Sequence, residues 1–323
     1  MKTHLFLGVV LVQFLAVGQT LIIEQSQCME INELAMANVA GNRLEEAETA
    51  ISAAASKGKY ICAGVALGNI AVLLSIRGRI RDSEAFAARS VDLLRKHADP
   101  NDPMLFRSLH VLAIARLEQG RFRKAEQAFE QMLQLRAERP EQRGQVHLTG
   151  GMLRQLQGDL KEAESEYLLA YEEWKQSGKT ADADAAAILN YLGALYITEE
   201  RFKEASQVLD RALAIVAAAE DAIPLDRIKL LNLRAAAHAR QGEWLEAQEK
   251  LRLAIAIAES EAVSEPVLLR SVLSNYAIAL RKNHHRKEAR SIERRASALP
   301  PDPPTGAVID IRELSAGLRT RQH

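Results

Sequence analysis

A short pattern of apolar, polar and small residues recurs along most of the chain. An apolar helix end is followed by glycine, a polar residue, a large apolar residue, two polar residues and a small residue, as from Gly120 to Ala125 and from Gly158 to Ala163. Glycine suits the left-handed backbone that ends many helices, and a small side chain lets two helices approach closely. The pattern therefore predicts two helices joined by a tight turn.

Seven copies of this pattern align on their small residue. These residues are Ala47, Ser83, Ala125, Ala163, Ala205, Ala247 and Ala289, separated by 36, 42, 38, 42, 42 and 42 positions. The large residue, expected to fill the elbow between the helices, is Leu44, Ile80, Phe122, Leu160, Phe202 or Trp244, and Arg286 replaces it in the last copy. Such a repeat predicts a stack of helix pairs in which each pair packs on its neighbours and the last has a more polar outer face.

The fifth copy resembles the tetratricopeptide repeat (TPR). Its first helix contains Leu192-Gly193-Ala194-Leu195-Tyr196, similar to the family's Leu-Gly-x-x-Tyr, and its second contains Phe202, Ala205, Leu209 and Ala212. The 42-residue period is similar to the longer-helix subgroup of kinesin light chains and many exported bacterial scaffolds. The resemblance covers residues 28–299 and implies an all-α fold, a right-handed α-solenoid of about seven helix-turn-helix units.

Composition and charge agree with a helical scaffold. Aromatic residues make up only 5% of the chain, and Lys plus Arg equals Asp plus Glu at 42 each, so no net charge favours nucleic acid or an anionic membrane. His110, His147 and His238 fall in three different repeats, and no catalytic or metal-binding motif occurs. We therefore expect no enzymatic activity, no cofactor and no metal.

The resemblance implies that the first helix of each pair lines a concave, peptide-binding face. The polar residues that it places there or next to it are Asn32, Asn69, Arg107, His110, Asn190, Lys229, Asn232, Arg240, Asn275 and Arg281. Asparagine is unfavourable inside helices, so its recurrence needs a reason. Either the amides bond the main chain of an extended peptide, since a carboxamide both donates and accepts, or they bond one another between repeats. The cations Lys229, Arg240 and Arg281 favour an acidic partner segment, unless the last of them belongs to a solvated end cap.

The chain has two cysteines, Cys28 and Cys62. Each lies near the start of the first helix of its own repeat, and first helices of neighbouring repeats run side by side. Helix axes pack 8 to 10 Å apart, which allows the α-carbon separation that a disulfide needs. The alternatives are a disulfide that an oxidising compartment preserves and two buried thiols.

Both ends of the chain differ from the repeats. Residues 1–18 resemble an export signal, with Lys2, an apolar run, and the small-x-small pattern Ala16-Val17-Gly18. Cleavage predicts a periplasmic or secreted protein, whereas an uncleaved signal would anchor the chain in the inner membrane. Residues 300–323 begin with a Pro-rich linker, and the tail after it either stays mobile or docks on the last helices.

These features together predict a non-catalytic scaffold of the cell envelope that binds an extended peptide segment of another protein. An alternative is an envelope assembly or self-association scaffold that uses its outer face or its ends. A third is the regulatory subunit of a separately encoded enzyme. We expect a protein partner, no nucleic acid, and no integral membrane segment apart from the signal or N-terminal anchor.

Overall fold

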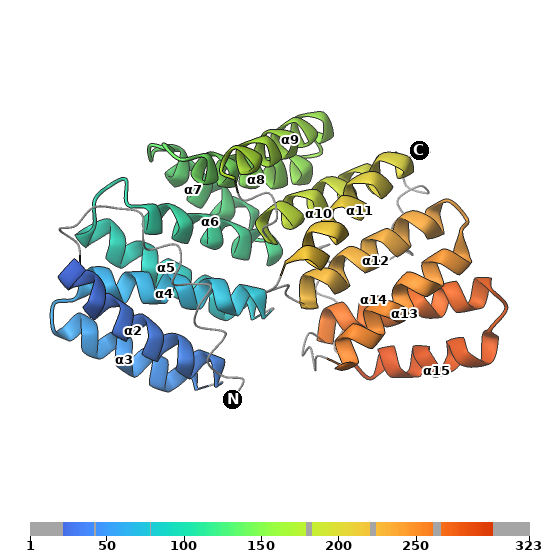
Figure 1. Cartoon of the computed structure of the whole chain (residues 1–323), viewed down its shortest axis with the longest axis horizontal. Coiled ribbons are helices and arrows are strands. Elements are labelled where there is room, and N and C mark those ends of the chain that lie inside the picture. The colour runs from blue at the N-terminus through green and yellow to red at the C-terminus, as the bar shows by residue number, and fades with distance from the viewer. Residues whose placement is uncertain are drawn as a thin grey trace. The chain divides into compact units, whose positions relative to one another are not determined.

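The computed structural model describes residues 22–41, 43–77, 79–178, 183–219, 224–260 and 266–299. The predicted signal at residues 1–18 and the tail at 300–323 lie outside these ranges. Fourteen helices and no strand occur in the part described (Figure 1). They are α2 (Ile22–Ala40), α3 (Leu44–Ser56), α4 (Tyr60–Ile76), α5 (Ile80–His97), α6 (Pro103–Glu118), α7 (Phe122–Leu133), α8 (Pro140–Gln157), α9 (Leu160–Gln176), α10 (Ala183–Thr198), α11 (Phe202–Ala218), α12 (Pro224–Arg240), α13 (Trp244–Ser260), α14 (Pro266–Lys282) and α15 (Arg286–Ser297).

The second helix of every pair begins at the elbow residue that the sequence pattern marks. The turn before it uses the left-handed backbone at Gly120, Gly158 and Gly242, with φ of 69°, 90° and 82°. Glu200 and His284 take the same conformation in the fifth and seventh pairs, with φ of 62° and 66°. The turn geometry is therefore kept even where a non-glycine residue makes it unfavourable.

The seven small residues that align the repeats all lie in the first turn of the second helix of their pair. All seven are fully buried, with exposed fractions of 0%, which confirms the predicted register. The elbow residues are less uniform. Phe122 is 47% exposed, so the prediction that it fills its elbow is wrong. Trp244 is half-buried, and the Lys282 ammonium lies 5.2 Å from the centre of its indole ring.

Glycines in the first helices mark further close approaches. A β-carbon at Gly193 would come within 2.6 Å of the Leu209 side chain, and one at Gly151 within 2.6 Å of the Tyr167 ring. Both distances are too short for non-bonded carbon atoms. The Leu-Gly pair of the fifth repeat is thus a packing requirement, and Gly151 meets the same requirement in the fourth.

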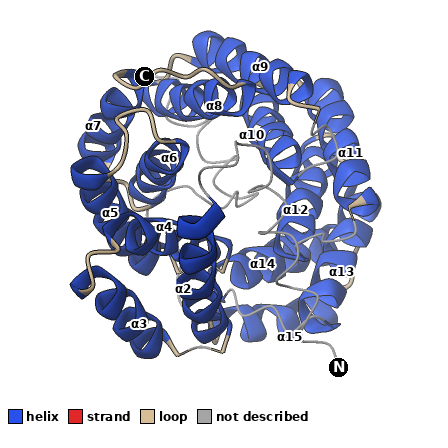
Figure 2. Ribbon diagram, turned by 60° about the vertical axis from the view of Figure 1, so that its left-hand side comes forward, coloured by secondary structure: helices blue, strands red, loops and turns tan. Residues whose placement is uncertain are grey.

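The described residues form two compact units. Unit 1 contains α2 to α5, α6 up to residue 116, and α7 from residue 123, whereas unit 2 contains residues 117–122 and α8 to α15. Within each unit, first helices of successive pairs are in contact, namely α2 with α4 in unit 1, and α8 with α10, α10 with α12 and α12 with α14 in unit 2 (Figure 2). These contacts between first helices determine the surroundings of the asparagines that were expected to bind a peptide.

Unit 1 also contains a covalent link. Cys28 of α2 and Cys62 of α4 form a disulfide, and their α-carbons are 4.8 Å apart. Of the two alternatives left open by the sequence, the structure has the disulfide. No helix in the described ranges combines the length and the hydropathy that crossing a membrane requires.

Candidate peptide-binding site

Four of the predicted asparagines bond to one another between neighbouring first helices. Asn69 Nδ2 donates to Asn32 Oδ1 at 2.9 Å, and Asn275 Nδ2 donates to Asn232 Oδ1, also at 2.9 Å. In both pairs the acceptor lies 15 residues before the small residue of its repeat. The donor lies 14 residues before the small residue of the next repeat. The two positions therefore define an acceptor position and a donor position in each repeat.

This pairing corrects the expectation that these amides line an open binding face. Asn69, Asn232 and Asn275 are only 4%, 2% and 0% exposed. A buried amide that already has a hydrogen-bond partner gains little from a second one. We therefore assign Asn32, Asn69, Asn232 and Asn275 to packing between repeats.

Asn190 of α10 has different surroundings. It occupies the acceptor position, but the donor position of the next repeat holds Leu233, whose side chain has no N–H. The Asn190 Oδ1 atom is buried, and no hydrogen bond to it is found among the described residues. Burying an amide oxygen without a donor is unfavourable by about 1 to 3 kcal/mol. Asn190 is thus an acceptor that a bound molecule could satisfy.

A second acceptor without a partner is Glu118, the last residue of α6, which belongs to unit 2. Its Oε2 atom is buried and has no hydrogen bond within the described ranges. Burial raises the pKa of Glu118, and the nearby Lys229 ammonium opposes this shift. Burial also raises the pKa of Asp226, in the first turn of α12, again opposed by Lys229.

Tyr191 interacts electrostatically with both Glu118 and Asp226. Burial is the main cause of its raised pKa, and the charges of Glu118 and Asp226 raise the pKa further. Tyr191 follows Asn190 in α10 and occupies a donor position, but the acceptor position of the preceding repeat holds Leu148.

We call Glu118, Asn190, Tyr191, Asp226 and Lys229 the inner cluster; all five residues belong to unit 2. The first four are half-buried and Lys229 is exposed, so solvent reaches the cluster in part.

The other predicted cations of unit 2 already have acidic partners. Arg240 bonds Glu200 at 2.7 Å, and Arg281 bonds Glu293 at 2.6 and 2.7 Å. These ion pairs neutralise the charge that was expected to attract an acidic segment. Of the predicted cations of this half, Lys229 is exposed and has no ion pair within the described ranges.

Arg107 and His110 lie on α6 within unit 1. His110 is buried, and its pKa falls to about 4, first because of burial and then because of the Arg107 charge. The imidazole is therefore neutral at pH 7. Both side chains have interactions within the protein, and we assign neither a ligand.

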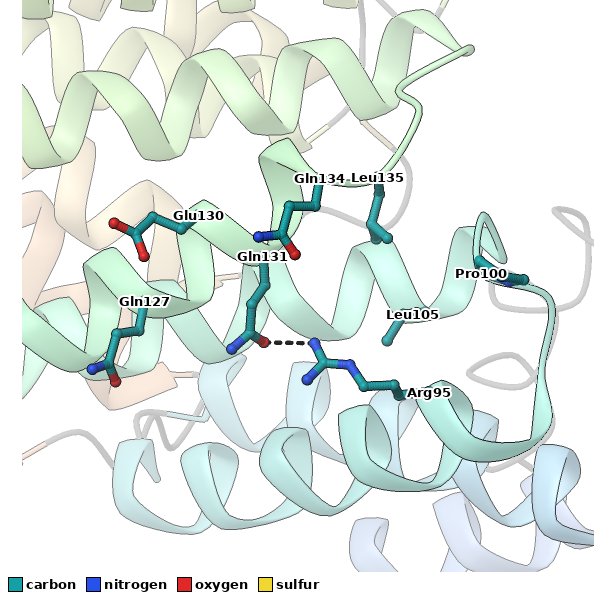
Figure 3. A pocket seen from close by; sticks show the side chains of 8 residues that line it. All are labelled: Arg95, Pro100, Leu105, Gln127, Glu130, Gln131, Gln134 and Leu135. Atoms are coloured by element: carbon teal, nitrogen blue, oxygen red, sulfur yellow. Dashed lines mark hydrogen bonds between the residues drawn. The ribbon is translucent and has the colours of Figure 1, made fainter.

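Unit 1 has a cavity between α5, α6 and α7 that the sequence did not indicate. It has a volume of about 580 Å³ and is formed by the end of α5, the start of α6, and α7 (Figure 3). Its lining residues are Arg95, Pro100, Leu105, Gln127, Glu130, Gln131, Gln134 and Leu135. The guanidinium of Arg95 donates to Gln131 Oε1 at 2.7 Å, so the cation is already bonded inside the cavity.

The histidines bear on the question of metal binding. His147 bonds Glu166 at 2.7 Å and His238 bonds Glu243 at 2.6 Å. Within the described ranges, no three or more His, Cys, Asp or Glu side chains converge as metal ligands would. Each of these His–Glu contacts is an ordinary hydrogen bond between two side chains, whereas a protein metal site uses three or four ligands.

Comparison with known families agrees with the repeat found in the sequence. Residues 62–138 and 146–218 match the model of the tetratricopeptide repeat family. The middle of this chain is thus similar in sequence to tetratricopeptide repeats. The matched stretches include most or all of α4 to α11, that is, the second to fifth helix pairs. A comparison with curated proteins gives no match.

Solved structures share the TPR solenoid fold. BtubC (BKLC) from P. vanneervenii is 20% identical, with a TM-score of 0.53 over 76% of this chain and 94% of that one. A Rap protein complexed with competence and sporulation factor is 18% identical, with a TM-score of 0.56 over 91% of this chain and 76% of that one. The apo quorum sensor NprR from B. thuringiensis is 14% identical, with a TM-score of 0.60 over 84% and 76%. Such identities show the fold alone, so the assignment to the 42-residue subgroup stays a prediction.

Proposed function

We propose that this TPR protein is a non-catalytic scaffold that binds an extended segment of another polypeptide along the first helices of unit 2. The observation that carries the proposal is the buried Asn190 oxygen without a donor. The equivalent oxygens of Asn32 and Asn232 are satisfied by the next repeat. Asn190 therefore keeps its hydrogen-bonding capacity for a ligand.

An extended peptide suits this acceptor chemically. Asn190 Oδ1 and Glu118 Oε2 both require N–H or O–H donors, and a peptide main chain offers an N–H at every residue. An extended chain rises about 3.3 Å per residue, so three residues span the roughly 8 to 10 Å between packed helices. A segment crossing α10 and α12 would thus present a similar group to each helix in turn.

The structural neighbours support a ligand-binding use of this fold. The Rap protein of similar fold was solved together with competence and sporulation factor, and NprR is a quorum sensor. TPR proteins are generally non-catalytic scaffolds. The proposed role therefore does not require any residue of the inner cluster to be catalytic.

A variant of Asn190 tests the proposal. The partner would be captured from cell-envelope extract on the mature protein, and its affinity would then be measured by calorimetry for wild type and Asn190→Ala. Loss of one hydrogen bond should weaken binding about 2- to 12-fold. Gln207→Ala on α11 is the matched control, because Gln207 is an exposed amide on a second helix. Equal affinities for wild type and Asn190→Ala would contradict the proposal.

We place this function in the cell envelope. The signal-like residues 1–18 support export, and the disulfide between Cys28 and Cys62 supports an oxidising compartment. Fractionation followed by intact-mass measurement should recover the protein from the envelope without residues 1–18. Full-length protein confined to the cytoplasm would refute this location.

A second candidate function is the assembly or self-association scaffold. It is favoured by exposed leucines on the second helices of unit 2, Leu168 and Leu169 on α9 and Leu245 and Leu253 on α13. Single exposed leucines are common on protein surfaces, so this observation is weaker than an unsatisfied buried acceptor. Sedimentation of wild type and Leu245→Lys would show whether the protein associates through α13.

A further inference from the structure

We infer that the bound segment carries a lysine or arginine side chain, and that the carboxylates of Glu118 and Asp226 bind it. This inference rests on the proposed function and adds the chemistry of the partner. It reverses the acidic partner that the sequence suggested, because the structure neutralises Arg240 and Arg281 with glutamates.

The charges of the inner cluster do not balance. Glu118 and Asp226 both act on the Tyr191 phenol, and Lys229 acts on both carboxylates. One ammonium cannot neutralise two carboxylates, so the cluster has a net negative charge when both are ionised. A second cation is the group that would complete it.

The position of Glu118 strengthens this argument. It is the last residue of α6, where the helix dipole disfavours an anion and favours a cation. Its Oε2 atom is also buried without a donor. The unbalanced charge of the cluster, the helix C-terminus and the buried oxygen without a donor thus meet at one carboxylate, and a cationic donor would relieve all three.

A lysine or arginine of a peptide fits this site. Both side chains are long enough to reach a partly buried carboxylate from a main chain that lies across the helices, and both carry several N–H donors. Asn190 Oδ1 can at the same time accept from the peptide main chain. The carboxylates of the inner cluster would then bind one side chain of the peptide, while the Asn190 amide oxygen accepts a hydrogen bond from its main chain.

Synthetic seven-residue peptides provide the test. A randomised library would be selected on the immobilised wild-type protein, and the best binder would be remade with norleucine in place of its lysine or arginine. We expect enrichment of lysine or arginine at one position, and a loss of affinity of about 10- to 100-fold with norleucine. Enrichment of acidic residues, or equal binding of the norleucine peptide, would overturn the inference and leave the proposed function standing.

Variants locate the effect in the cluster. Glu118→Gln with Asp226→Asn should bind the basic and norleucine peptides with affinities within about twofold of each other, close to that of wild type for the norleucine peptide. Glu249→Gln, an exposed glutamate on α13, should keep the wild-type preference. If the double variant does not fold, Asp226→Asn alone serves and should reduce the preference at least severalfold. An unchanged preference overturns the inference, whereas a wild-type protein that retains no peptide overturns the proposed function as well.

Discussion

The contacts α10/α12 and α12/α14 place the same residue type at the same position in two different environments. In α12/α14, Asn232 accepts from Asn275, and the pair is sealed between repeats. In α10/α12, Asn190 faces a repeat with Leu233 at the donor position, and its oxygen has no partner among the described residues. The role of an asparagine in this solenoid therefore depends on one residue of the next repeat.

The α2/α4 contact resembles α12/α14 but adds a disulfide, which should dominate its stability. Replacing Cys28 and Cys62 by serine opens a loop of 34 residues and should lower the free energy of unfolding by about 3 to 4 kcal/mol. Denaturant unfolding with and without a reductant measures this loss. Reduced wild type is the control and should unfold like the double serine variant; no difference from oxidised wild type would argue against the disulfide.

Leucine substitutions test directly whether the asparagines of the α10/α12 and α12/α14 contacts differ in their contribution to stability. Asn275→Leu removes the amide that donates to the Asn232 oxygen in a buried pair and should cost about 1 to 3 kcal/mol. Asn190→Leu removes an oxygen that already has no donor, so the unliganded protein should keep or gain stability. Thermal unfolding of both variants decides the matter, and equal losses would mean that α10 and α12 use their asparagines alike.

Ala205 and Ala247 test whether the helix pairs that carry these asparagines cross in the same way. Each is fully buried in the first turn of its second helix, so replacement by leucine should cost about 1 to 3 kcal/mol through overpacking. Ala217→Leu, at an exposed position of α11, controls for the added bulk. Wild-type melting temperatures for the buried variants would place the crossing elsewhere.

The smallest effect is expected at the turns. His284 holds a left-handed backbone before α15, where Gly242 holds it before α13. His284→Gly should stabilise the protein by about 0.5 to 1 kcal/mol, because relief of strain exceeds the entropy that glycine adds to the unfolded chain. Gly242→Ala is the reverse substitution and should destabilise. A loss of stability in His284→Gly would indicate that the histidine makes a compensating contact.

The sequence was enough to predict the helix pairs, because their determinants are local. Ala163 and Ala205 are small since two helices cross there, and the left-handed turns before α9 and α13 are at the predicted glycines. One local signal was overlooked. Proline begins α6, α8, α12 and α14, as it often begins helices, and would have fixed the starts of these first helices.

The inner cluster could not be predicted in the same way. Glu118 and Tyr191 belong to repeats that are not adjacent in sequence, and only the packing of unit 2 lets their charges interact. The sequence marked the recurring asparagines, but whether each amide was paired depended on the alignment of neighbouring helices. Comparing the acceptor position of each repeat with the donor position of the next would have singled out Asn190.

The disulfide between α2 and α4 also affects how the stack comes apart. In a linear array, the pair with a neighbour on one side only frays first, since it loses the fewest contacts on opening. Among the described helices, α2–α3 and α14–α15 are such pairs, and only α2 is fastened covalently to the next pair. Fraying should therefore be directional, with α15 exchanging its amide hydrogens and admitting proteases well before α2.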